Sequence, residues 1–130
     1  LINHIKMHGL KSMLTELDTR WYADGFASKQ PSVVNKVRTM VAKTPIEGYI
    51  AATIAVRDFD IIEQLPDIKA PMLLITGAED KATPLSEAKF INEKCPNADL
   101  TIIDNASHLA MVEKPKTFDH ALVNFIKGIG

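Results

Sequence analysis

Two short apolar runs, each followed by a polar loop, constrain the fold of this chain more than any other feature. The runs are Met72–Thr76 and Leu100–Ile103. Their length, and the Pro, Gly and polar residues around them, are typical of strands buried on both faces of a parallel sheet. Between them, Thr83 and Pro84 begin a helical stretch that continues to about Lys94. The sequence therefore predicts a right-handed β-α-β unit.

A further helix follows this unit, and the sheet that it would cover is incomplete. The helix begins at Lys114-Pro115 and ends near Gly128. Its apolar face consists of Phe118, Leu122, Phe125 and Ile126. Two parallel strands are not a stable sheet by themselves. We therefore expect one edge of the sheet to be unpaired here and to pair with strands that these 130 residues do not contain.

The first half of the chain has helical periodicity throughout. Two apolar faces follow helical spacing and are separated by Gly25–Pro31; they consist of Leu10, Met13, Leu14, Leu17 and Trp21, and of Val33, Val34, Val37, Met40 and Val41. The change of pattern predicts an α/β chain with a helical region over residues 1–65 and a β-α-β-α region over residues 66–130.

A third helix in the first half has a recognisable start. Thr44-Pro45-Ile46-Glu47 places Thr44 at the N-cap, Pro45 at the first helical position and Glu47 where a capping box requires it. We expect a short helical turn around Ile61–Leu65, stopped by Pro66.

Composition excludes several classes of function. Apolar residues make up 46% and charged residues 24%, which are globular values, and a net charge of -1 argues against a nucleic-acid partner. No apolar run is long enough to cross a membrane. The only cysteine, Cys95, fits a reducing compartment, so we expect a cytoplasmic protein. His4 and His8 could share a helix face, but neither they nor His120 have the spacing of a metal site.

The loops after the two predicted strands carry an acid and a histidine. Asp80 follows the first strand, and His108 follows the second. Since both loops leave a parallel sheet at its C-terminal end, where ligands of open α/β sheets bind, the two side chains should lie close together. A carboxylate there can orient an imidazole for acid–base catalysis. Alone, Asp80 is more often a turn or cap residue and His108 a surface residue; the pair favours catalysis.

The nucleophile of such a site is missing from the sequence. No Gly-x-Ser-x-Gly pattern occurs in the chain. Ser86 should lie in the first turn of a helix, where hydroxyls usually cap backbone N–H groups. Ser107 adjoins His108, and neighbouring side chains usually point apart. Both serines are therefore poor candidates.

Two motifs carry a resemblance to a known fold. Ala70–Pro84 is similar to the seventh strand and acid loop of the α/β-hydrolase fold. Asn105–Leu109, with Glu113-Lys114-Pro115 just after, resembles its histidine loop and last helix. The order of acid and histidine also agrees with that fold. Four segments of the first half resemble the helical cap of 3-oxoadipate enol-lactonases: Arg20-Trp21-Tyr22, Pro31–Met40, Thr44–Tyr49 and Arg57–Asp60.

The resemblance implies a cofactor-free bacterial hydrolase of the aromatic degradation route, which opens an enol-lactone with water through an acyl-enzyme. By that likeness Asp80 is the triad acid and His108 the general base. The serine elbow and the oxyanion loop of the family precede the cap, and neither occurs in this sequence. We therefore expect the C-terminal portion of a hydrolase, inactive alone, which pairs with the missing N-terminal part or self-associates.

Other functions remain open. The same fold supports general esterases, C–C hydrolases and cofactor-free peroxidase-type enzymes. A non-catalytic module that associates through its open sheet edge is an alternative of another class. Trp21 could line a substrate pocket, although simple packing is favoured. Arg20 and Arg57 could bind a substrate carboxylate, but a surface role, or pairing with Asp58 or Asp60, is at least as common.

Overall fold

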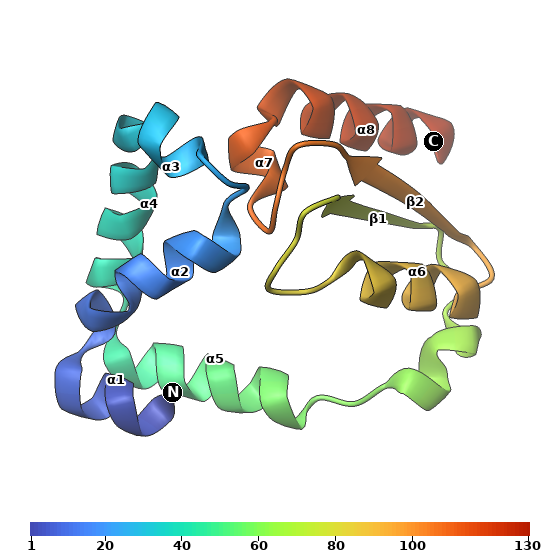
Figure 1. The fold of residues 1–130 in the computed structure, drawn as a ribbon. Coiled ribbons are helices and arrows are strands. Elements are labelled where there is room, and N and C mark those ends of the chain that lie inside the picture. Colours follow the sequence, from blue (N-terminus) through green and yellow to red (C-terminus); the bar gives the residue numbers. More distant parts are fainter.

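The computed structural model describes all 130 residues, with a helical group on one side and a small sheet between helices on the other (Figure 1). In chain order the elements are α1 (Ile2–His8), the 3-10 helix η1 (Leu10–Met13), α2 (Leu14–Trp21), α3 (Phe26–Lys29), α4 (Pro31–Lys43), α5 (Ile46–Asp58), the 3-10 helix η2 (Ile62–Asp67), β1 (Met72–Gly77), α6 (Leu85–Lys94), β2 (Ala98–Ile103), α7 (Ala110–Glu113) and α8 (Pro115–Gly128).

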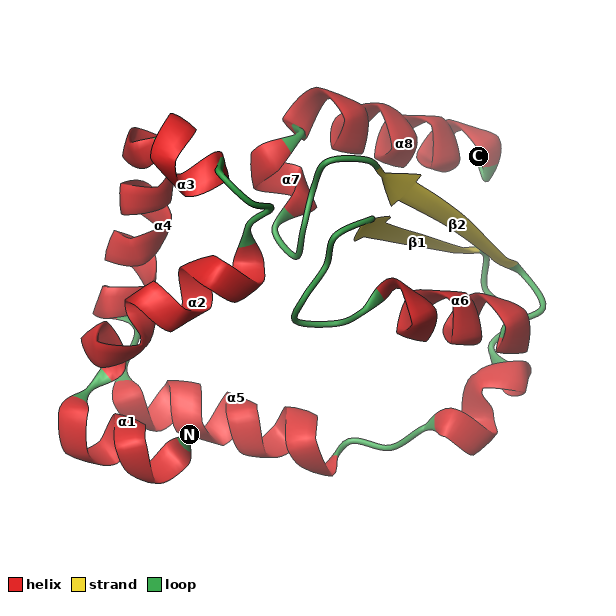
Figure 2. Ribbon diagram, viewed as in Figure 1, coloured by secondary structure: helices red, strands yellow, loops and turns green.

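The second half forms the predicted β-α-β unit with a closing helix. Strands β1 and β2 are parallel, with Met72 opposite Ala98 and Gly77 opposite Ile103. They form the only sheet, of two strands (Figure 2). Helices α6 and α8 cover its opposite faces. Since the two strands are parallel and in register, the loops after β1 and β2 emerge together at one end of the sheet.

The prediction that both strands are buried on both faces is wrong. Met72–Ile75 of β1 are only half-buried, and Ile102 of β2 is 40% exposed. Burial is complete only near the C-terminal strand ends, at Thr76, Gly77 and Ile103. The physical reason is that each strand has a neighbour along one edge only, so the apolar residues that the sequence supplies are not fully covered.

The helical half has its own small core. Buried Ile5, Leu10, Met13 and Leu17 form its centre; around them pack Trp21, Val41, Ile46, Tyr49 and Ile50. The predicted apolar face on Leu10–Trp21 is therefore confirmed, although it is shared between η1 and α2. In α4, Val34 is buried, whereas Met40 is exposed, contrary to the predicted face. No helix of the structure combines the length and apolar character needed to cross a membrane.

Three local predictions need correction. Thr44 does not cap α5: its hydroxyl donates to the Met40 carbonyl at 3.2 Å, so it serves the end of α4, and α5 begins at Ile46. The segment Gly25–Pro31 contains the short helix α3 rather than only a separator. Pro66 lies within η2 instead of stopping it, because the fixed φ of proline suits a 3-10 turn.

Gly77, the last residue of β1, packs closely against the backbone of the loop after β2. A Cβ at this position would collide with the carbonyl oxygens of Ala106 and Ser107, which are backbone atoms with no room to retreat. We expect Gly77→Ala to lower the free energy of unfolding by about 1–3 kcal/mol, as overpacking does. Urea unfolding of the chain measures this loss.

The matched control for this substitution is Gly48→Ala. Gly48 lies in α5 and a Cβ there meets no atom within 4 Å. Since alanine favours a helix over glycine by up to about 1 kcal/mol, this variant should be as stable as the original chain or more stable. Equal stability of the two variants would contradict the close approach at Gly77.

Candidate active site

The loops that follow β1 and β2 are joined by backbone hydrogen bonds beyond the ends of the strands. Ala78 N–H donates to Ile103 O at 2.9 Å, and Glu79 N–H donates to Ala106 O at 2.9 Å. In the second loop, Asn105 has a φ of 53°, a left-handed conformation that asparagine tolerates better than most residues. The pairing fixes both loops at the same edge of the sheet.

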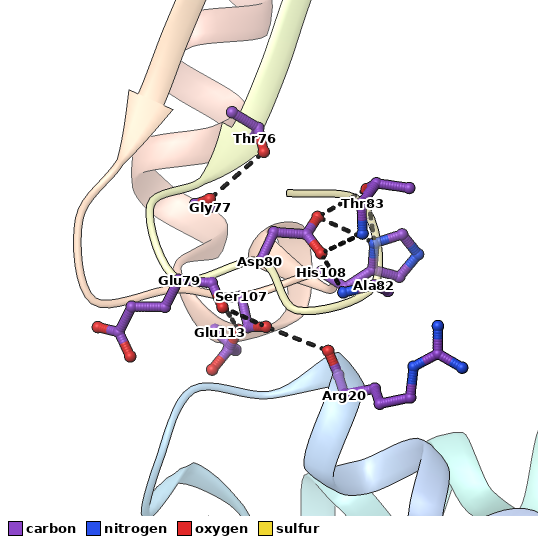
Figure 3. A network of polar contacts seen from close by, with 10 residues as sticks. All are labelled: Arg20, Thr76, Gly77, Glu79, Asp80, Ala82, Thr83, Ser107, His108 and Glu113. Carbon is purple, nitrogen blue, oxygen red and sulfur yellow. Dashed lines mark hydrogen bonds and ion pairs between the residues drawn. The ribbon is translucent and has the colours of Figure 1, made fainter. Parts of the chain in front are cut away.

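The Asp80 carboxylate is held by four hydrogen bonds. Its Oδ1 accepts the backbone N–H groups of Ala82 and Thr83, both at 2.8 Å, and its Oδ2 accepts the Thr83 hydroxyl at 2.9 Å (Figure 3). The fourth donor is the imidazole of His108, whose Nδ1 lies 3.0 Å from Oδ2. The side chain of Asp80 is only 5% exposed. The carboxylate therefore has one fixed orientation.

The contact between Asp80 and His108 determines which ring nitrogen carries the proton when the imidazole is neutral. An ionised carboxylate only accepts hydrogen bonds, so Nδ1 carries the proton. The lone pair of the neutral ring is then on Nε2. The His108 side chain is 34% exposed, whereas that of Asp80 is 5% exposed. A reactant can therefore reach the imidazole but not the carboxylate. The predicted hydrogen-bonding distance between Asp80 and His108, 28 residues apart in sequence, is confirmed.

Asp80 stays ionised at neutral pH. Burial acts to raise its pKa, but the hydrogen bonds from Thr83, His108 and Ala82 outweigh burial and hold the pKa below the usual value of 3.8. Because the folded-state pKa is depressed, this group stabilises the fold above about pH 4, and the stabilisation is lost as the pH falls through the lowered pKa. Over the physiological range the carboxylate remains available to the imidazole.

The histidine loop also contacts the chain at the end of α2. The buried Ser107 hydroxyl lies 3.0 Å from Glu79 O and 3.2 Å from Arg20 O. Leu109 N–H donates to Trp21 O at 3.0 Å. The loop that carries His108 is therefore bound on one side to the loop after β1 and on the other to the helical half.

Glu113 adds a second link between the same two regions. Its Oε1 accepts the N–H of Ala23 at 2.8 Å, and its Oε2 accepts the N–H of Ser107 at 2.6 Å.

Nearby Tyr22 is buried and stacks on Phe26. Burial, followed by the negative charges of Asp18 and Glu113, raises the pKa of Tyr22 to about 12, so its hydroxyl stays protonated.

A hollow of about 290 Å³ adjoins the pair. It is lined by Asp80 and His108 together with side chains of β1 and α6, among them Leu74, Thr76 and Ile91. A larger hollow of about 720 Å³ lies between η2 and α6, and neither Asp80 nor His108 lines it. The smaller hollow is thus the one beside the imidazole.

Comparison with known proteins places this geometry in a family. No family model matches the chain. A 3-oxoadipate enol-lactonase of Acinetobacter baylyi is 32% identical over 123 residues, which are 95% of this chain and 46% of that protein. The structure of MGS-M2, an α/β-hydrolase enzyme from a deep-sea metagenome library, is 28% identical and superposes with a TM-score of 0.82 over 97% of this chain. The chain belongs to the α/β-hydrolase family.

A third match concerns the fold alone. The enol-lactonase from Burkholderia xenovorans LB400 superposes with a TM-score of 0.93 at 23% identity, over 97% of this chain and 48% of that structure. The α/β-hydrolase chain therefore spans about half the length of the relatives it matches. Its two strands and the helices around them correspond to the C-terminal part of the fold.

The other candidate residues of this α/β-hydrolase chain have different surroundings from one another. Trp21 packs against the core of the helical half and does not line the hollow beside His108. Arg57 pairs with the neighbouring Asp58 at 2.6 Å. Arg20 is exposed and forms no ion pair. Its guanidinium reaches toward the side of the site on which the His108 ring lies (Figure 3).

Neither candidate serine of the α/β-hydrolase chain is placed to react. Ser107 is fully buried, and its hydroxyl lies against two carbonyl oxygens. Ser86 is exposed on the first turn of α6 and lines the larger hollow, away from His108. No group of three or more His, Cys, Asp and Glu side chains is arranged to hold a metal ion.

Sequence reasoning missed two residues that complete the site. Thr83 contributes both a backbone N–H and a hydroxyl to Asp80. A partial signal was present, since the side chain of a turn Asp commonly accepts backbone N–H groups that follow it closely. Glu113 stands in a segment that resembles the start of the last helix of the fold, but its contact with Ala23 left no local signal, because the two residues are 90 positions apart.

Proposed function

We propose that these residues form the acid–base half of a serine-type hydrolase of carboxylic esters or lactones. In this proposal residues 66–130 carry Asp80 and His108, and residues 1–65 form a helical cap beside them. The observation that carries it is the 3.0 Å contact between Asp80 Oδ2 and His108 Nδ1, which leaves the Nε2 lone pair of the neutral imidazole free in a side chain that is 34% exposed. The nucleophilic serine and the oxyanion-binding groups come from outside residues 1–130, so the isolated chain is inactive.

The two side chains have distinct roles in this reaction. His108 Nε2 removes the proton of the serine hydroxyl as its oxygen attacks the substrate carbonyl, and it then gives the proton to the leaving oxygen. Asp80 fixes the ring and stabilises the imidazolium that forms. Water then attacks the acyl-enzyme with His108 again acting as the base, which releases the acid. No cofactor is required by these steps.

The substrate that we propose is 3-oxoadipate enol-lactone, an intermediate of aromatic compound degradation. Support comes from the name of the A. baylyi relative, which matches 95% of this chain. The exposed, unpaired Arg20 offers a partner for the carboxylate that such a lactone carries. The single cysteine, Cys95, is buried and free, which is compatible with the cytoplasmic location that we also propose.

The test is hydrolysis by the complete protein that contains residues 1–130. The substrates are the enol-lactone, a simple aliphatic ester, a C–C diketone and a halide–peroxide mixture. We expect the enol-lactone to give the highest kcat/KM. A higher kcat/KM for the neutral ester would reduce the function to a general esterase, and turnover of only the diketone or the peroxide would contradict the proposal.

The substitution Arg20→Gln tests whether Arg20 binds the carboxylate of the substrate. Loss of a charge-assisted contact of about 1.5–3 kcal/mol should raise KM for the enol-lactone by about tenfold to a hundredfold and leave hydrolysis of the neutral ester unchanged. Arg57→Gln is the matched control, because Arg57 is already paired with Asp58. Equal effects of the two substitutions on KM would show that Arg20 does not bind the substrate.

Exposed apolar surface supports a second part of the proposal, association with the remaining half of the hydrolase. On the last helix and beyond, the exposed apolar side chains are Leu122, Val123, Ile126 and Ile129. Each strand also has an unpaired edge. Size measurement of the isolated chain should therefore give dimers or aggregates. A compact monomer with an intact core would instead favour a self-sufficient, non-catalytic module.

A further inference from the structure

His108 lies between two residues that are both bound to the helical half. Ser107 precedes it and contacts Arg20 O through its hydroxyl, and Leu109 follows it and donates its N–H to Trp21 O. Both acceptors are consecutive carbonyl groups at the end of α2. The position of the His108 backbone is therefore set by how the chain near Arg20–Ala23 docks on the histidine loop.

Glu113 is the one side chain whose two oxygens join these backbones directly. It lies at the end of α7 and is only 9% exposed. One oxygen accepts the N–H of Ser107, the residue before His108, and the other accepts the N–H of Ala23, just after α2. The remaining cross-link in this region, Lys81 with Asp24 at 2.5 Å, is at the surface and contacts neither neighbour of His108.

We propose that Glu113 is a positioning residue for His108, which couples the docking of the helical half to the placement of the imidazole against Asp80. This rests on the proposed role of His108 as the base. Without the carboxylate, the buried N–H of Ser107 and the partly buried N–H of Ala23 lose their acceptor, and the backbone at Ser107, next to His108, is free to turn toward another partner. Because Asp80 is held independently by Ala82 and Thr83, the acid would stay in place while the imidazole moves away from it.

The test compares Glu113→Gln and Glu113→Ala in the complete protein. Glutamine keeps one acceptor oxygen and alanine keeps none, so the effects should be graded. Since a misplacement of about 1 Å can cost about a hundredfold in rate, we expect kcat to fall about tenfold for glutamine and about a hundredfold for alanine, with KM changed less than threefold. Glu93→Gln, an exposed position on α6, makes the same chemical change and should have no effect.

Stability is measured beside activity so that a purely structural role can be recognised. Urea unfolding gives the folded fraction, and kcat is expressed per folded molecule. If Glu113→Gln lowers only the unfolding free energy and leaves kcat per folded molecule unchanged, the proposal is overturned. If Glu113→Ala does not fold, the glutamine variant still decides the question.

A second readout does not depend on activity. In proton NMR spectra, the His108 Nδ1–H resonance reports the hydrogen bond to Asp80, and it should shift or broaden in Glu113→Gln but not in Glu93→Gln. An unchanged resonance would contradict the proposal even if the protein hydrolyses no ester. Retained activity in Asp80 and His108 variants, by contrast, would overturn the proposed function and leave this spectroscopic test of Glu113 intact.

Discussion

Replacing His108 with glutamine in the complete protein should lower kcat for ester or lactone hydrolysis by about a millionfold, the effect of removing the base from an intact catalytic triad. Glutamine is close in size and can still donate to Asp80, but it cannot take up the proton of a serine hydroxyl. KM should change little, because the proposed role of His108 is in the chemical step. Initial rates over a range of substrate concentrations measure both constants.

The control for this variant is His120→Gln. His120 lies on α8, is exposed and bonds to Asn124 at 2.9 Å. This substitution should leave kcat and KM unchanged. A loss of less than about tenfold in His108→Gln would exclude His108 as the base, since general acid–base catalysis alone contributes at least about a hundredfold.

Asp80→Asn should lower kcat by about ten-thousandfold at neutral pH, because it reverses the tautomer of His108. The structure decides how asparagine would lie. Oδ1 accepts two backbone N–H groups, from Ala82 and Thr83, so the amide oxygen must stay there. The NH₂ group then faces His108 Nδ1 as a donor, and the ring must carry its proton on Nε2, where the base is needed.

The same geometry predicts that Asp80→Asn folds. Asparagine keeps both backbone contacts, so the loss of unfolding free energy should be far smaller than the loss of activity. Asp99→Asn, at an exposed site on β2, is the control and should be neutral for both quantities. Full activity in Asp80→Asn would mean that the carboxylate does not act on the imidazole.

Sequence pattern was enough to predict how Asp80 and His108 meet. The prediction depended on two local features, the apolar runs at Met72–Thr76 and Leu100–Ile103 and the loops after them. Once both runs are parallel strands, topology brings the loops to one edge. Nothing about distant partners was needed, and the 3.0 Å contact between the two side chains follows from that arrangement.

Other parts of the fold depend on partners that local pattern does not reveal. Thr44 has the sequence of a cap, but its hydroxyl donates to the Met40 carbonyl of the preceding helix and accepts no backbone N–H of α5. Ile102 has the sequence of a buried strand residue but is exposed, since burial depends on the neighbours of the sheet. Glu113 belongs to a residue type that is usually exposed, but it is buried here and accepts the N–H groups of nearby Ser107 and of Ala23, which is 90 residues away.

The most direct test of the central claim is to determine which ring nitrogen of His108 carries the proton in the complete protein. Long-range ¹H–¹⁵N NMR correlations distinguish the two ring nitrogens. In the neutral form of the ring we predict the proton on Nδ1, and a shift of that proton to Nε2 in Asp80→Asn. A ring that carries its proton on Nε2 in the original chain, or that is unaffected by Asp80→Asn, would contradict the account that Asp80 prepares His108 as a base.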